Sequence, residues 1–232
     1  MKAYDHIAAE WSKFRKNPIS ALYAFLPYLK ADAVVLEAGC GNGRNLAEIA
    51  KHCRQAYGID SSQQMVLQAR KKLGERKGEV KESPITLLQA DIRKLPFPDE
   101  MFDAVFCLAV LHHIKPREQG KALRELARVL KSGGLLLCSV WNKKHPKLVS
   151  LGKASGKPAL KSASPGEMVA WTKKSGKEGD RYYYFFELDE LGKKAAREGF
   201  SVERLFFERK GKQALEAEAF NLCLVARKKI SG

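Results

Sequence analysis

The chain has 232 residues, of which 45% are apolar, and this is enough for one α/β domain with a well-buried core. Its longest apolar runs, 104–111 and 135–141, are too short to span a bilayer, and its first residues lack the apolar core of a signal peptide. The net charge of +16 favours a nucleic acid or another acidic surface as a partner, although a lysine-rich surface that only aids solubility would also explain it.

Residues 1–30 are predicted to form a helical cap, because apolar side chains recur at helical spacing on both sides of Pro18. After the cap, apolar runs of strand length alternate with helical segments. Strands are predicted at 33–37, 55–60, 85–92, 102–114, 135–141, 200–208 and 220–228, and helices from about Asn42, then at 62–73, 117–131 and 188–198. The alternation predicts one α/β domain over 1–232, with a doubly wound, mostly parallel, seven-stranded sheet. The last two strands have no helix between them, so we expect them to pair as a hairpin with an antiparallel last strand.

Five cysteines, at positions 40, 53, 107, 138 and 223, are scattered along the chain without a C-x-x-C pair. This spacing does not favour a zinc site in the chain itself. Several of the cysteines stand inside apolar runs, which is typical of buried free thiols in a reducing compartment. We therefore expect a cytoplasmic protein with no metal site and no membrane partner.

A basic insertion is predicted at 142–180. Residues 143–181 hold ten lysines and arginines against three acidic residues, among many glycines, serines and prolines. Such a segment is expected to be flexible and to contact phosphates. Five aromatic residues follow it at 182–186, too close together for a platform that stacks many bases. We predict a core strand here, with Phe185 and Phe186 in the core and Arg181 and one or two of the tyrosines beside it at the mouth of a site.

The first strand of the sheet ends in a glycine-rich turn, with glycines at 39, 41 and 43 that let the backbone approach a ligand closely. The turn does not fit the dinucleotide fingerprint G-x-G-x-x-G, because Arg44 stands where the third glycine is required. Asp60 closes the second strand, where its carboxylate can accept both hydroxyls of a ribose. Asp91 ends the third strand, where it can bind an adenine amino group or cap the turn.

These motifs, over 33–141, resemble the class I S-adenosylmethionine-dependent methyltransferases. The resemblance implies S-adenosylmethionine as cofactor. It also implies a set of cofactor-binding residues: Glu37, Gly39, Gly41, Asn42, Gly43, Asp60, Ser61, Asp91, Ile92, Leu108 and Ala109.

Four further segments extend the resemblance to nearly the whole chain: YDHIAAEWSKFR, SVWN, MVAW and RYYYFFELDEL. They occur in this order in the tRNA wobble-uridine carboxymethyl methyltransferases. The family resemblance implies methyl transfer to the carboxylate of 5-carboxymethyluridine in the tRNA anticodon loop, which forms a methyl ester. It also implies site residues in the two outer motifs, Arg15, Arg181 and Tyr182, with either arginine as a clamp for a carboxylate or phosphate.

The chain departs from this family at three places: NPIS replaces a tryptophan between two prolines after Arg15, Tyr184 replaces a histidine, and Ala170 replaces a proline. These departures bear on the substrate rather than on methyl transfer. His112 and His113 follow the fourth strand, and each can contact the substrate or serve as a turn residue satisfied by backbone groups. We take His112 as the candidate catalytic histidine.

Two other functions are compatible with parts of the pattern. A methyltransferase for a small molecule or quinone would use the terminal extensions as a lid, but it would leave the positive charge unexplained. A tRNA-binding module without catalysis would not need the glycine turn or Asp60 and Asp91.

The resemblance also implies a small zinc-binding activator subunit as a partner. The strand at 85–92 is apolar and is expected at one edge of the sheet, where a partner can add a strand. Leu87 and Leu88 are the predicted contacts, unless the charged connector before this strand covers the edge.

Overall fold

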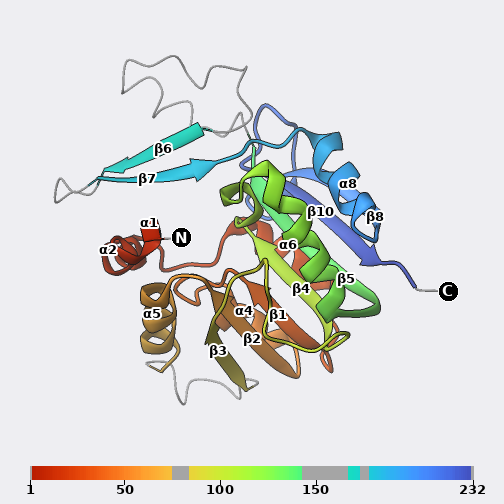
Figure 1. Ribbon diagram of the computed structural model, residues 1–232, viewed down its shortest axis with the longest axis horizontal. Helices are drawn as coiled ribbons and strands as arrows, with labels where there is room; N and C mark the ends of the chain where they lie inside the picture. Colours follow the sequence, from red (N-terminus) through yellow and green to blue (C-terminus); the bar gives the residue numbers. More distant parts are fainter. Residues whose placement is uncertain (1, 75–83, 143–166, 173–177, 231–232) are drawn as a thin grey trace.

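The computed structural model describes residues 2–74, 84–142, 167–172 and 178–230. Figure 1 shows a central twisted sheet with helices on both sides. The strands are β1 (Val34–Ala38), β2 (Gln55–Asp60), β3 (Ile85–Gln89), β4 (Phe102–Leu108), β5 (Leu130–Trp141), β6 (Glu167–Thr172), β7 (Glu178–Tyr183), β8 (Phe200–Arg209), β9 (Lys212–Gln213) and β10 (Asn221–Lys228). The α-helices are α1 (Lys2–Asp5), α2 (Ala8–Phe14), α3 (Ser20–Phe25), α4 (Leu46–Ile49), α5 (Gln63–Gly74), α6 (Pro116–Val129) and α8 (Leu188–Arg197), and the 3-10 helices are η1 (Leu26–Tyr28), η2 (Ala50–His52) and η3 (Leu111–His113).

The main sheet has the strand order β3-β2-β1-β4-β5-β10-β8-β9. The first five strands along the chain pair in parallel, whereas β10 lies antiparallel between β5 and β8. The predicted fold class and the terminal hairpin are confirmed. The sheet has one strand more than the seven predicted, because the two-residue β9 pairs with the outer edge of β8.

Two apolar cores hold the helices on the faces of the sheet. On one face, α6 packs through Ala122, Leu123, Leu126 and Val129, at the spacing of a single helical stripe, and α8 joins the same core. On the other face, α3 and α4 pack on the centre of the sheet. All five residues of β1 are buried, as expected for a central parallel strand covered on both sides. Because helices cover the sheet on both faces, the parallel strands are held in place. Their carboxyl ends form the site described below.

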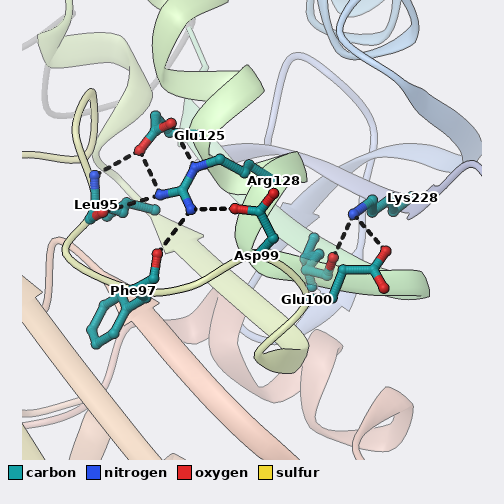
Figure 2. Close-up of polar contacts among 8 residues, drawn as sticks. Leu95, Phe97, Asp99, Glu100, Glu125, Arg128 and Lys228 are labelled. Atoms are coloured by element: carbon teal, nitrogen blue, oxygen red, sulfur yellow. Dashed lines mark hydrogen bonds and ion pairs between the residues drawn. The ribbon is translucent and has the colours of Figure 1, made fainter.

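The connection from β3 to β4 is held to α6 by one arginine (Figure 2). The Arg128 guanidinium donates to the carbonyl oxygens of Leu95 and Phe97, at 3.0 and 2.8 Å, and pairs with Asp99 at 2.8 Å. It also binds Glu125 on its own helix, which in turn accepts a hydrogen bond from the Leu95 amide at 2.7 Å. A long connection is thereby fixed without secondary structure of its own.

Two predicted strands end differently in the structure. The strand predicted at 102–114 stops at Leu108, because Ala109 has φ +58 and a 3-10 turn follows. The aromatic run at 182–186 is not a strand of the main sheet. Its first two residues end β7, which pairs with β6 in a separate two-stranded ribbon, and the Tyr184 amide then donates to the His112 carbonyl at 2.7 Å. Phe186 lies in the core as predicted, whereas Phe185 is only half-buried.

The predicted helical cap and the described part of the predicted basic insertion both border the carboxyl end of the sheet. Helices α1 and α2 lie against α5, and α1 also contacts β7 (Figure 1). Of the insertion predicted at 142–180, the structure describes the ribbon strands β6 and β7, whereas 143–166 and 173–177 lie outside the described residues. The ribbon and the cap therefore approach the sheet from the side where the parallel strands end.

Candidate active site

A cavity of about 270 Å³ opens at the carboxyl ends of the parallel strands. Its lining comes from the glycine turn after β1, the ends of β2, β3 and β4, the η3 turn, the helical cap and β7. The predicted site residues that line it are Gly39, Gly41, Asp60, Ser61, Asp91, Ile92, Leu108, Ala109 and Tyr182. The cavity therefore joins segments that extend along the chain from Tyr4 to Tyr182.

Glycine is required at the first position of the turn. Gly39 has φ +88, and a Cβ there would lie 2.2 Å from Cγ2 of Val110. The amides of Gly39 and Cys40 both donate to the Ile59 carbonyl, at 2.8 and 2.7 Å, so the turn is tied to the end of β2. At Gly41 the nearest atoms to such a Cβ belong to Trp11 at 3.9 Å, an ordinary van der Waals distance, so the indole ring lies over this part of the turn.

Asp60 is oriented by two backbone amides. Its Oδ2 accepts from the Gly41 amide and its Oδ1 from the Ser62 amide, both at 2.9 Å. Burial raises the pKa of this carboxyl above its usual value, and the two amide bonds oppose that rise. Each oxygen has a second lone pair, so the carboxylate can still accept two hydroxyl groups of a ribose. This geometry fits a nucleoside-containing cofactor.

Asp91 has a different environment, although it also ends a strand. It caps the following turn through the Arg93 amide at 2.9 Å, and the Arg93 guanidinium donates to both of its oxygens at 2.6–3.2 Å. The hydrogen bonds to Arg93 lower the pKa of Asp91. Its acceptor sites are used within the loop, so its geometry matches capping rather than recognition of an adenine amino group.

Three predicted cofactor residues lie behind the cavity lining. Glu37 is fully buried, and its Oε1 accepts a hydrogen bond from Asn45 Nδ2 at 2.8 Å. Asn42 Nδ2 donates to the Arg15 carbonyl at 2.9 Å, which attaches the glycine turn to the end of α2. At Gly43, a Cβ would lie 3.1 Å from the Ala69 Cβ, so this glycine allows α5 to pack closely. The contacts of Glu37, Asn42 and Gly43 therefore hold the glycine turn in place from the side away from the cavity.

The two adjacent histidines have separate positions, and the structure places His113, not His112, in the cavity lining. His112 is buried, with its ring stacked on Tyr183 at 5.1 Å and its Nδ1 accepting from the Trp141 amide at 3.2 Å. His113 Nδ1 lies 2.8 Å from the Tyr182 carbonyl, and its Nε2 lies 2.9 Å from the Tyr4 hydroxyl. A carbonyl only accepts, so Nδ1 carries a proton, and the Tyr4 hydroxyl donates to Nε2 whenever Nε2 carries none.

The two candidate arginines, Arg15 and Arg181, also differ in position, and a third arginine that was not a candidate reaches the cavity. Arg15 does not line the cavity; its guanidinium lies 5.9 Å from the centre of the Trp11 ring. Arg44, which the sequence pattern marked only as a departure from the dinucleotide fingerprint, does line it. Arg181 has its backbone in β7, opposite Val169, and its side chain lies outside the described residues.

The cavity is also lined by residues that were not predicted from the sequence as site residues. They include Tyr4, Trp11, Asn45, Met65, Arg93, Lys115 and Glu118. Most of them follow a strand end or belong to the cap, where side-chain direction depends on tertiary contacts rather than on periodicity. Tyr4 and Trp11 stand within the N-terminal motif, and that motif was the signal that could have identified them.

Residues 36–138 match a protein family described as a methyltransferase domain. Residues 36–138 therefore carry a methyltransferase domain, and the chain has the class I fold of solved S-adenosylmethionine-dependent methyltransferases. S-adenosylmethionine is therefore the cofactor of this methyltransferase, and the glycine turn, Asp60 and the apolar residues at the end of β4 fit it. No helix in the described parts of the methyltransferase is long and apolar enough to cross a bilayer.

The methyltransferase is 29% identical over 201 residues to a protein of Encephalitozoon cuniculi (strain GB-M1) whose name gives it only as a methyltransferase. That match covers 86% of this chain and 85% of the other protein. It is 36% identical over 141 residues to the tRNA (carboxymethyluridine(34)-5-O)-methyltransferase of Arabidopsis thaliana, which covers 60% of this chain and 32% of the plant protein. The chain therefore spans about a third of the length of that relative.

A solved complex between the Haloferax volcanii Trm112 methyltransferase activator and a methyltransferase contains a chain of the same fold. The TM-score is 0.66 at 18% sequence identity, and the match covers 100% of this chain and 98% of that one. At this identity, the likeness describes the fold.

Proposed function

We propose that this methyltransferase transfers a methyl group from S-adenosylmethionine to the carboxylate of 5-carboxymethyluridine at the wobble position of tRNA, forming a methyl ester. The main support is that two motifs far apart in the sequence border one cavity. Tyr4 and Trp11 come from the N-terminal motif and Tyr182 from the second motif, and all three line the cavity beside the cofactor residues. The similarity to a tRNA carboxymethyluridine methyltransferase and the net charge of +16 agree with this substrate.

The chemistry requires orientation more than proton transfer. S-adenosylmethionine supplies a methyl group on a positively charged sulfur. The pKa of a carboxymethyl group is roughly 4, so the substrate is already a nucleophilic anion at neutral pH and needs no general base. The carboxylate oxygen must lie in line with the methyl carbon at about 3 Å, and the enzyme must hold that geometry while excluding water.

His113 and Tyr182 are suited to a positioning role in this step. The His113 ring binds the Tyr182 carbonyl on one side and the Tyr4 hydroxyl on the other, so it joins the cap to β7 across the cavity. We assign the cofactor-binding role to Gly39, Gly41, Asp60, Ser61, Ile92, Leu108 and Ala109, which line the cavity. Arg181 remains the proposed clamp for the substrate carboxylate, because an arginine fork meets a carboxylate in two parallel hydrogen bonds.

The bond that forms provides the most direct test. Bulk tRNA is incubated with methyl-labelled S-adenosylmethionine and then treated with mild alkali. A methyl ester should release its label as methanol, whereas methyl groups on nitrogen or carbon would stay with the tRNA and contradict the proposal. Binding to tRNA should also weaken steeply as salt concentration rises, which a small-molecule or quinone methyltransferase would not show.

The role of Arg181 has its own test. Arg181→Ala should abolish transfer to tRNA and leave the dissociation constant for S-adenosylhomocysteine within about 2-fold, as measured by calorimetry. Arg197→Ala, an exposed arginine at the end of α8, is the matched control and should keep transfer. Equal loss of cofactor binding in Arg181→Ala would argue against a substrate role.

We also propose that a small zinc-binding activator subunit pairs with β3, which is one of the two edge strands of the main sheet. The two candidate contacts differ: Leu88 is 37% exposed, whereas Leu87 is half-buried, and a Cβ on Gly58 would lie 2.9 Å from its Cδ2. Leu88→Glu is therefore the cleaner test, because Leu87→Glu would also disturb the core. Leu88→Glu should abolish co-purification with the zinc subunit, and Leu215→Glu, which is exposed near the opposite edge, should not. Retained binding by Leu88→Glu would exclude this edge.

The setting we propose for this activity is the cytoplasm. All five cysteines are buried and free, which suits a reducing compartment.

A further inference from the structure

Arg44 is a half-buried cation in the lining of the cofactor cavity. It follows the glycine turn directly, and its Nη1 donates to the Asn17 carbonyl at 3.2 Å. Its guanidinium carbon lies 5.3 Å from the centre of the Trp11 ring. Among the described residues, no carboxylate forms an ion pair with it. A positive charge removed from water without a counter-ion is unfavourable, so the site favours an anionic ligand.

Among the described residues, Glu37 is the carboxyl group with a noted electrostatic influence on Arg44, and it does not neutralise this arginine. Burial raises the pKa of Glu37 to about 8, so this carboxyl is mostly protonated at neutral pH. Burial and the nearby charge of Arg15 lower the pKa of Arg44 to about 10, which still leaves the guanidinium charged at neutral pH. Both guanidinium groups lie close to the Trp11 ring, at 5.9 Å for Arg15 and 5.3 Å for Arg44, so positive charge accumulates in this part of the site.

The strand order indicates how a bound ligand is oriented in the cavity. The carboxyl ends follow the order β3, β2, β1 and β4, with Asp60 at the end of β2 and Arg44 on the turn after β1. A cofactor whose ribose binds Asp60 and whose base lies toward Ile92 has its amino-acid part over the glycine turn. Trp11 closes that part of the cavity, since it is the nearest side chain above Gly41.

We infer that Arg44 binds the carboxylate of the amino-acid part of the methyl donor, with Arg15 adding positive charge from behind Trp11. The planar guanidinium can meet this carboxylate in a charge-assisted, bidentate pair. The helical cap then completes the cofactor site, because Trp11 and Arg15 both belong to it. This assignment does not depend on which substrate the enzyme methylates.

Two ligands that differ only in the carboxylate test the inference. Calorimetry compares S-adenosylhomocysteine with its decarboxylated analogue on the wild-type protein and on Arg44→Gln. The wild-type protein should bind S-adenosylhomocysteine about 10- to 100-fold more tightly than the analogue. Arg44→Gln should lose most of that difference while binding the analogue almost as well as the wild type does. Arg70→Gln, an exposed arginine on α5, is the matched control and should keep the full difference.

Several outcomes would overturn the assignment. Equal affinity of the wild-type protein for the two ligands would do so without any variant, and so would an equal loss for both ligands in Arg44→Gln. If Arg44→Gln fails to fold, Arg44→Lys serves instead, and it should keep part of the difference because lysine offers a point charge without the fork.

The other source of a carboxylate is the substrate proposed above, and a separate arm distinguishes it. Anticodon stem-loop RNA with and without a carboxymethyl group is bound to the wild-type protein and to Arg44→Gln in the presence of S-adenosylhomocysteine. The preference for the carboxymethyl group should not change in the variant. A lost preference with unchanged affinity for S-adenosylhomocysteine would move Arg44 to the substrate and overturn the inference.

Discussion

The cavity has two walls that are built differently. The donor wall, proposed to hold the methyl donor, consists of Gly39, Gly41, Asp60 and Leu108 and comes from successive strand ends. The acceptor wall, proposed to face the methyl acceptor, consists of Tyr4, His113 and Tyr182 and comes from three segments far apart in the chain. Backbone hydrogen bonds fix the donor wall, as at the amides of Gly39 and Gly41. The acceptor wall is joined by one imidazole ring that binds both tyrosines. A protein built in this way can change its methyl acceptor without rebuilding the part that holds the cofactor.

The largest effect is expected where the donor wall has no space. Gly39→Ala would place a Cβ 2.2 Å from Val110 Cγ2 at a φ of +88, so we expect about 2–5 kcal/mol of destabilisation and loss of cofactor binding. Gly133→Ala separates the two causes, because Gly133 has φ +74 but no atom within 4 Å of the added Cβ. Thermal unfolding should show a clearly smaller loss for Gly133→Ala. Equal losses would mean that the positive φ, and not the clash with Val110, causes the destabilisation at Gly39.

A pH effect is expected from the acid behind the donor wall. Burial raises the pKa of Glu37 from 4.5 to about 8. Between these values the unfolded chain releases this proton and the folded chain keeps it, so the free energy of unfolding falls as pH rises through that window. Glu37→Gln has no such proton.

The wild-type protein should therefore lose unfolding free energy relative to Glu37→Gln as the pH rises from 5 to 8. The expected change in this difference is on the order of 3 kcal/mol, and the difference should stay constant above that range. Denaturant unfolding at several pH values measures it. The raised pKa of Asp60 acts in both proteins and cancels in the difference. A constant difference would mean that Glu37 is ionised in the folded protein, and it would also weaken the case for Arg44 as a cation without a counter-ion.

Within the donor wall, the two strand-end acids should differ. Asp60→Asn should weaken binding of S-adenosylhomocysteine about 10- to 100-fold, because it removes a charged acceptor from the cavity. Asp91→Asn should change it only a few-fold, since Asp91 is engaged by Arg93. Calorimetry on the two variants makes the comparison, and a larger loss for Asp91→Asn would place the main ligand contact at β3.

The smallest effect is expected in the acceptor wall. Tyr4→Phe removes the hydroxyl that binds His113 and keeps the aromatic ring that contacts Trp11. We expect kcat/KM for tRNA to fall about 3- to 10-fold, with the affinity for S-adenosylhomocysteine unchanged. Tyr23→Phe, an exposed tyrosine on α3, is the matched control. Loss of cofactor affinity in Tyr4→Phe would show that the two walls are not independent.

The donor wall could largely be predicted from sequence, because strand periodicity and the glycine spacing locate the carboxyl ends of β1 and β2. The η3 turn could not be predicted in the same way. The run from 102 to 114 is almost continuously apolar, with no glycine or proline where β4 ends, and Ala109 adopts its positive φ without a local signal. Two adjacent histidines on a 3-10 turn point in different directions, and tertiary contacts with Tyr4, Tyr182 and Tyr183 decide which one reaches the cavity.

The helical cap has a consequence for how the molecule folds. The contact between Tyr4 and His113 closes a loop of 109 residues, and the contact from His113 to Tyr182 closes one of 69. Contacts this distant in sequence form slowly, because the loop must close before any interaction offsets its entropy. During synthesis the first helices can dock on α5, but Tyr4 has no partner until His113 of η3 and then Tyr182 of β7 have been made, so the acceptor wall should be the last part of the active site to assemble.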